Sequence, residues 1–176
     1  MDTIELSEPS EEYADDILKF KQEIMDSDDN DKFAGCGNLD SCSSIQDWIY
    51  DTKIMSNPDT CPIGRVPSNI YIAVRKTDNK IVGIIDLRHH IDTPILSTWG
   101  GHIGYTVRPY ERNKGYATQM LKLNLLNAKK RGIDKLLLVC NTDNIGSEKT
   151  ILNNGGTFES TLVIDDAIVK RYWITI

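Results

Sequence analysis

Hydrophobic residues recur along the chain with two spacings, and the changes between them predict the order of helices and strands. A spacing of three to four residues predicts four helices, from Ser10 through Ile24, Ser43 to about Met55, Gly115 to Gly132, and Ile145 to about Asn153. Alternation, or a short continuous apolar run, predicts seven strands, at 3–6, 70–74, 80–88, 103–107, 136–140, 157–164 and 168–176. Acidic residues, glycines or prolines mark the connections at 26–41, 57–68 and 89–97 as loops.

Polar residues at the starts of these helices support the assignment. Ser10 can cap the first helix, and two acidic residues follow it in the first turn. Ser43 and Gln46 have the spacing of a capping box for the second helix. Asn144 or Asp143 caps the last helix.

The connections between strands predict how the strands pair. A turn at 77–79 makes an antiparallel hairpin, and a turn at Asp165 and Asp166 makes a second one. The strands at 103–107 and 136–140 are joined through a helix, and such a crossover is right-handed and makes the two strands parallel. We therefore expect an α/β fold with a mixed sheet and helices on both faces.

The stretch from Gly101 to Thr118 is where the pattern indicates chemistry. It reads as a strand that ends at Pro109, then a tight turn, then a helix that starts at once. The first N–H groups of a helix lack internal partners and lie at the positive end of its dipole. Gly115 has no side chain, so an anion can approach the backbone there. Basic residues at the positive end of a helix dipole are unfavourable unless an anion is bound. The stretch therefore predicts a phosphate or pyrophosphate site, the alternative being an ordinary glycine turn.

Two common phosphate loops are absent from the sequence: it has neither G-x-x-x-x-G-K-[ST] nor G-x-G-x-x-G after a strand. The pattern [RQ]-x-x-G-x-[GA] is present, with Arg112, Gly115 and Ala117 at its defined positions. With this motif between a strand and an amphipathic helix, the chain resembles the GCN5-related N-acetyltransferases (GNAT), chiefly over 70–158. The resemblance implies one domain over 1–176, with a mixed central sheet splayed between two parallel strands.

The resemblance also implies a cofactor and the residues that hold it. Acetyl-CoA would be the acetyl donor, and coenzyme A the product. Its pyrophosphate would lie on the turn and the start of the helix, at Arg112, Asn113, Lys114, Gly115, Tyr116, Ala117 and Thr118. The backbone of Val107, or of a residue next to it, would meet the pantetheine arm and polarise the thioester carbonyl. Asn144 would contact the pantetheine as well as cap its helix, and Ser147 would face the cofactor one turn later.

The catalytic residues are less constrained. Many relatives have a tyrosine seven residues after the asparagine, as the acid for the leaving thiolate, where this chain has Ile151. His102 is the first candidate for the base, because its ordinary pKa lies near neutrality, and its alternative is a structural histidine. Glu159 is the second candidate, with an exposed strand residue as the alternative. Asp86, Arg88 and His90 form either an acceptor site or surface charge.

Composition narrows the function further. The 176 residues carry a net charge of −6, which disfavours nucleic-acid binding, and no apolar run approaches the length of a membrane span. The four cysteines have no C-x-x-C spacing and make no metal-ligand pattern with the three histidines. We expect reduced thiols, a cytoplasmic protein and no metal, and we leave open whether it forms a homodimer.

The expected activity is acetyl transfer from acetyl-CoA to an amine of a small molecule or peptide. We expect direct transfer in a ternary complex, because no cysteine occupies a convincing nucleophile position. One alternative is a non-catalytic acyl-CoA-binding or sensor domain, which the isoleucine at 151 motivates. Another is a nucleotide-phosphate-binding domain that uses the same turn.

Overall fold

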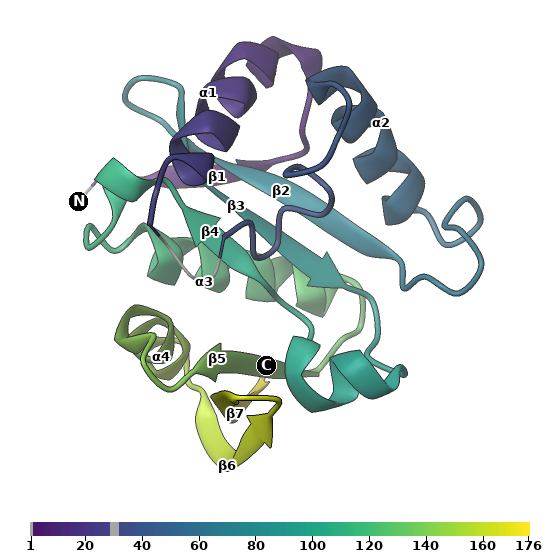
Figure 1. Cartoon of the computed structure of the whole chain (residues 1–176), viewed down its shortest axis with the longest axis vertical. Helices are drawn as coiled ribbons and strands as arrows, with labels where there is room; N and C mark the ends of the chain where they lie inside the picture. The colour runs from purple at the N-terminus through teal and green to yellow at the C-terminus, as the bar shows by residue number, and fades with distance from the viewer. Residues whose placement is uncertain (1, 29–31) are drawn as a thin grey trace.

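Seven strands form two sheets in the part of the chain described by the computed structural model, residues 2–28 and 32–176 (Figure 1). The first sheet has the order β1-β2-β3-β4, with bounds Ile4–Ser7, Ser68–Arg75, Lys80–Arg88 and Tyr105–Val107. The second has the order β5-β7-β6, with bounds Lys135–Asn141, Ala167–Thr175 and Thr157–Ile164. Both predicted hairpins, β2–β3 and β6–β7, are confirmed as antiparallel pairs.

Four α-helices pack against these sheets in the described residues. Their bounds are Ala14–Met25 for α1, Ile45–Ser56 for α2, Tyr116–Lys130 for α3 and Ile145–Asn153 for α4. Helices α1 and α2 cover one face of the first sheet, and α3 lies behind its other face (Figure 1). The predicted arrangement of helices on both faces is therefore confirmed. None of these helices has the length and apolarity needed to cross a membrane.

The alternation along β2 and β3 explains why the first sheet is buried on both faces. Ile72 and Ile84 join the cluster with the apolar stripes of α1 and α2. Ala73 and Ile85 point the other way, into a cluster with Leu121 of α3. Strands with both faces covered are expected to be apolar at successive positions, as these are.

The cluster around α3 also joins the two sheets. It contains Leu138 of β5 and Tyr172 of β7, together with Ile151 of α4 and residues of the first sheet. Each of these three side chains has no more than 2% of its surface exposed. The same apolar core therefore fixes the second sheet against the first.

The join between the sheets is the feature that positions the candidate site. The backbone N–H of His102 donates to the carbonyl oxygen of Leu137 at 2.8 Å. Further along, Tyr105 of β4 reaches Ser147, which follows β5 in α4. The two strands therefore run in the same direction and diverge after His102. We call this divergence the parting of β4 and β5.

The parting confirms the predicted splay between two parallel strands, and it divides the expected mixed sheet into two antiparallel sheets. All strand ladders in the described residues are antiparallel, and none joins β4 to β5. The backbone hydrogen bond from His102 to Leu137 closes one end, while the side chains of Tyr105 and Ser147 bridge the open end. Strands held apart in this way cannot form a ladder.

Three local predictions need correction. The cap of α2 is Ser44, whose Oγ accepts the N–H of Asp47 at 3.0 Å, and not Ser43. Ser10 makes no side-chain cap bond, and a 3₁₀ turn, η1 (Glu11–Tyr13), precedes α1. The loop predicted at 89–97 runs into a helical turn, η2 (Leu96–Gly100), that the apolar spacing did not indicate. Part of the loop predicted at 26–41 lies outside the described residues.

Candidate functional site

The turn before α3 has the backbone shape of an anion site. Gly115 stands at the N-cap of α3 with φ 80°, and Asn113 has φ 59°, so the chain turns through two left-handed residues. Ser44 and Asn144 cap α2 and α4 with their side chains, whereas no side chain caps α3. The first N–H groups of α3 are thus left for a ligand or for water.

The charges beside this turn are arranged differently from the sequence prediction. Glu111 is buried, and its Oε2 accepts from Lys114 Nζ and from Arg75 Nη1, each at 2.9 Å. Burial raises the pKa of Glu111, but the hydrogen bonds from Lys114 and Arg75 outweigh it and hold that pKa below its usual value. Arg112 Nε donates to the carbonyl oxygen of Val107 at 3.1 Å. Backbone N–H groups, more than free side-chain charge, would therefore hold an anion here.

Tyr116 contributes its backbone to this turn and its side chain to the core. The ring is 3% exposed and packs in the cluster around α3. Its hydroxyl receives a hydrogen bond from Arg75 at 3.2 Å. Ala117 and Thr118, which follow it in the first turn of α3, are half-buried.

The backbone of β4 presents unpaired positions toward the parting. On either side of β4, Arg108 N–H donates to Val82 O at 2.8 Å, and Asp86 N–H donates to Gly104 O at 3.0 Å. The even-numbered positions of this segment therefore bond to β3. In an antiparallel pair the intervening residues direct their backbone groups the other way. Tyr105 and Val107 therefore turn their N–H groups toward the parting, and the contact expected between Val107 and the pantetheine stays a prediction.

A pair of hydroxyls bridges the open end of the parting. Asn144 Oδ1 accepts the N–H of Ser147 at 3.0 Å, which confirms Asn144 as the cap of α4. Ser147 Oγ lies 2.7 Å from the phenol oxygen of Tyr105. Burial is the largest effect on that phenol and raises the pKa of Tyr105 to about 12. Sequence reasoning missed Tyr105; its only signal was its alternation on the strand before the turn.

The position where relatives have a tyrosine is occupied by a core residue. Ile151 is 1% exposed and lies in the cluster around α3. A Cβ added to Gly156 would come within 2.4 Å of Ile151 Cγ2, so the glycine makes room for this side chain. Position 151 is therefore packed in the core, where the isoleucine supplies no proton.

His102 lies at the closed end of the parting and is held by the backbone of β5. Its Nδ1 accepts the N–H of Leu137 at 2.9 Å, so a neutral ring carries its proton on Nε2. Neither nitrogen is then free to accept a proton. Burial lowers the pKa of His102 to about 4. The role of base stays a prediction, and this geometry favours the structural alternative.

Glu159 lies on β6, outside the parting. It accepts hydrogen bonds from Arg171 Nε at 2.5 Å and from Trp173 Nε1 at 2.7 Å. The bond from Arg171, followed by that from Trp173, lowers the pKa of Glu159 to about 2. A carboxylate of this acidity is a weak base at neutral pH. Its role as base also stays a prediction, and the structure does not bring it together with His102.

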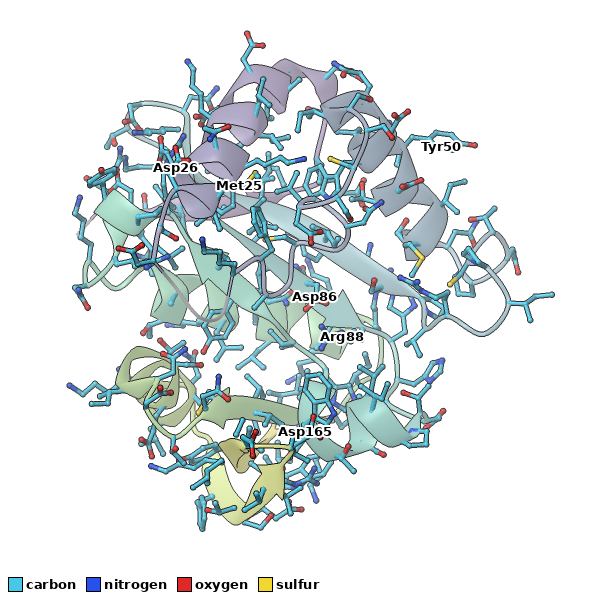
Figure 2. All side chains as sticks on the ribbon, viewed as in Figure 1. Met25, Asp26, Tyr50, Asp86, Arg88 and Asp165 are labelled. Atoms are coloured by element: carbon cyan, nitrogen blue, oxygen red, sulfur yellow. The ribbon has the colours of Figure 1, made fainter. Side chains whose placement is uncertain are left out.

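The polar cluster at the end of β3 divides into two parts. Asp86 is buried, accepts the N–H of Gly104 at 2.5 Å and pairs with Arg88 at 3.1 Å. Figure 2 shows these two side chains together on β3, above the second sheet. His90 is separate and lies 3.1 Å from Asp92. Burial is the largest effect on Asp86 and raises its pKa. Asp86 and Arg88 thus fix the chain that leads into β4.

A comparison of the sequence with models of protein families shows to which family the chain belongs. The family model described as an acetyltransferase (GNAT) domain matches residues 4–157, which is most of the chain. The chain belongs to the GNAT acetyltransferase family. No curated protein sequence matches the chain.

Solved GNAT structures have the same fold. The microcin C7 self-immunity acetyltransferase MccE, in complex with acetyl-CoA and AMP, aligns with TM-score 0.68 and 20% identity over 100% of this chain and 94% of its own. RimL, a ribosomal L7/L12 acetyltransferase in complex with coenzyme A, aligns with TM-score 0.69 and 17% identity over 99% and 94%. A Salmonella typhimurium acetyltransferase that modifies the N-terminal serine of L7/L12 aligns with TM-score 0.62 and 18% identity over 99% and 95%.

Other kinds of site are not apparent in residues 2–28 and 32–176. No group of three or more histidine, cysteine, aspartate or glutamate side chains there could hold a metal ion. None of its four cysteines forms a disulfide, and Cys36 and Cys140 are buried. The parting and the turn before α3 are therefore the features on which a function can be built.

Proposed function

We propose that this GNAT protein transfers an acetyl group from acetyl-CoA to an amine of a small molecule or peptide. One observation carries the proposal: the uncapped start of α3 stands at the end of β4, whose Tyr105 and Val107 N–H groups face the parting. An anion-binding turn next to an open row of backbone donors suits an extended ligand with a pyrophosphate at one end.

The residues present fit the cofactor. The backbone from Arg112 to Thr118 would surround the pyrophosphate. Val107 would bond the pantetheine arm, and Asn144 and Ser147 would approach it from α4. Acetyl-CoA supplies an activated thioester when bound. The other acetyltransferase structures with bound acetyl-CoA or coenzyme A support this assignment.

The reaction needs no covalent enzyme intermediate. The nitrogen lone pair of the neutral amine forms a bond to the acetyl carbon, and the carbon–sulfur bond breaks with its electrons on sulfur. Backbone N–H groups of β4 would stabilise the oxyanion. The amine would lose one proton to water, and the thiolate would receive one from the Ser147–Tyr105 pair, which stands where the parting opens. The pair would then regain its proton from water. His102 and Glu159 remain the sequence-based candidates for the base.

We infer the setting of this activity from the same chain. The core shared by both sheets supports one acetyltransferase domain over 1–176. Four cysteines without a disulfide in the described residues support a cytoplasmic location. Relatives named for acetylating a ribosomal protein support a peptide amine as one class of acceptor. Homodimer formation stays a prediction.

A non-catalytic acyl-CoA sensor is the second candidate. Three observations favour it: Ile151 supplies no acid, His102 Nδ1 is bonded, and Glu159 is paired with Arg171. Release of free thiol from acetyl-CoA, measured over a panel of amines and peptides, separates the two functions. Amine-dependent thiol release with matching acetyl-amine by mass spectrometry supports the enzyme. Tight acetyl-CoA binding without release for every amine would support the sensor.

A further inference from the structure

A cavity of about 550 Å³ lies beside the turn between β6 and β7 and is separate from the residues assigned to the cofactor. Its lining comes from three segments: Trp99 of η2, Asn141 and Val169 on the second sheet, and the turn at 164–167. The volume lies within the range of small-molecule pockets, about 300–1,000 Å³. Figure 2 shows Asp165 at this turn, below Asp86 and Arg88.

The cavity lies on the face of the second sheet that is turned away from α3. Asn141 pairs with Val169 across β5 and β7, and their side chains share one face. Leu138 and Tyr172, a pair three positions away along the same two strands, point to the other face, into the core with α3. A ligand in the cavity and a cofactor at the start of α3 would therefore approach the parting from opposite sides.

Trp99 is held at the cavity wall although 47% of its surface is exposed. Arg171 Nη1 donates to the carbonyl oxygens of Ser97, at 2.8 Å, and Thr98, which fixes η2 on β7. Glu159 in turn holds Arg171, because its Oε2 accepts a hydrogen bond from Arg171 Nε. The Glu159–Arg171 ion pair is thus placed to position the indole of Trp99. This positioning gives the ion pair a structural role on the second sheet.

The chemistry of the lining selects a kind of ligand. The indole of Trp99 and the side chains of Ile164 and Val169 offer flat, apolar contact. Within the described chain, the carboxylates of Asp165 and Asp166 make no ion pair. Their negative charge at the turn repels a carboxylate on the ligand and attracts a cationic group. An aromatic wall beside negative charge is a recurring way of binding an organic ammonium.

We propose that this cavity binds the body of the acceptor. The acceptor is a primary amine carried on an aromatic or similarly flat apolar group, with no carboxylate beside the amine. The acetylation of this acceptor rests on the proposed acetyltransferase function, whereas the binding of the acceptor to the cavity does not. The body lies against Trp99, and the amine points toward the parting.

Matched pairs of amines test this selectivity. We expect kcat/KM for tryptamine to exceed that for tryptophan, and for phenethylamine to exceed that for phenylalanine, by at least about tenfold. Exchanging both Asp165 and Asp166 for asparagine should narrow each ratio by roughly three- to tenfold. Spermidine and a short peptide with a free N-terminus serve as the competing classes. A clear preference for either one over tryptamine would overturn the proposal.

Variants at Trp99 locate the effect. Trp99→Ala should lower kcat/KM for tryptamine about tenfold, mainly through KM, because one aromatic contact is lost. Trp99→Phe keeps a ring and should stay within about threefold. Arg171→Lys keeps the charge but loses the fork that holds η2, and should raise KM for tryptamine. Acetyl-CoA affinity should be unchanged in all three. An unchanged KM in Trp99→Ala would refute the assignment.

Calorimetric binding of tryptamine to the protein saturated with coenzyme A separates this proposal from the proposed function. Binding that depends on Trp99 without any turnover would support the cavity and reject the enzyme. Turnover of other amines, with no binding or reaction of tryptamine, would reject the cavity and leave the enzyme standing.

Discussion

Replacing His102 tests whether this histidine is a base or a structural residue. His102→Ala removes the acceptor of the buried Leu137 N–H, whose bond to Nδ1 is 2.9 Å long. An unsatisfied buried donor costs about 1–3 kcal/mol. His102→Asn is the matched control, because asparagine can place Oδ1 where Nδ1 stands and cannot titrate. We expect His102→Ala to lose about 1–3 kcal/mol of unfolding free energy and His102→Asn to lose less.

The pH dependence of stability gives a second readout. The pKa of His102 is about 4 in the folded protein and 6.5 in the reference state, so the unfolded chain binds its proton first. The histidine's contribution is therefore complete above pH 6.5 and falls as pH decreases toward 4. Between pH 7.5 and 4.5 the wild type should lose up to about 2–3 kcal/mol more than His102→Asn. Nearby charges, including Arg88 and Asp92, are common to both proteins and cancel in the comparison.

Urea denaturation at these two pH values, with turnover measured in parallel, decides between the roles. A structural His102 predicts near-normal turnover in His102→Asn at neutral pH. A stable His102→Asn protein whose turnover falls by roughly 10²–10⁴, with loss of the acid limb of the rate profile, would refute this reasoning. That result would show that His102 acts as the catalytic base.

Three further substitutions test neighbouring parts of the site. Ile151→Tyr should cost about 1–3 kcal/mol in thermal unfolding, since the side chain is buried; unchanged stability with faster turnover would show room for an acid there. Gly104→Ala should destabilise the protein in urea, because its Cβ would lie 2.7 Å from Gly35 N; wild-type stability would contradict that contact. Tyr105→Phe should lower kcat as much as Ser147→Ala and the double variant; additive losses would show that the two hydroxyls act separately.

Much of the fold could be predicted because local sequence signals agree with the tertiary structure. The hairpins, the asparagine cap at 144 and the buried run at 136–140 each have a local physical cause. The N-cap of α2 was assigned to the wrong one of two adjacent serines, because Ser43 and Ser44 differ only in backbone geometry. The turn η2 depends on Arg171, which is remote in sequence, so its spacing carried no signal.

The candidate site was less predictable than the fold. The turn at Gly115 follows from a motif, but the neutralisation of Lys114 by buried Glu111 requires the packed structure. His102 was proposed from its ordinary pKa, and only its bond to Leu137 indicates another role. Tyr105 was missed because its partner, Ser147, is on a distant helix. Such long-range contacts are what sequence patterns do not encode.

Binding of acetyl-CoA to Gly115→Glu tests the central claim most directly. The substituted carboxylate would stand at the uncapped start of α3 and oppose the pyrophosphate by both bulk and charge. Gly132→Glu is the control, because Gly132 has a similar φ of 75° and no atom within 4 Å of an added Cβ. By calorimetry, we expect Gly115→Glu to weaken acetyl-CoA binding at least about a hundredfold and Gly132→Glu to bind as the wild type does. Equal affinity in all three folded proteins would contradict the assignment of this turn.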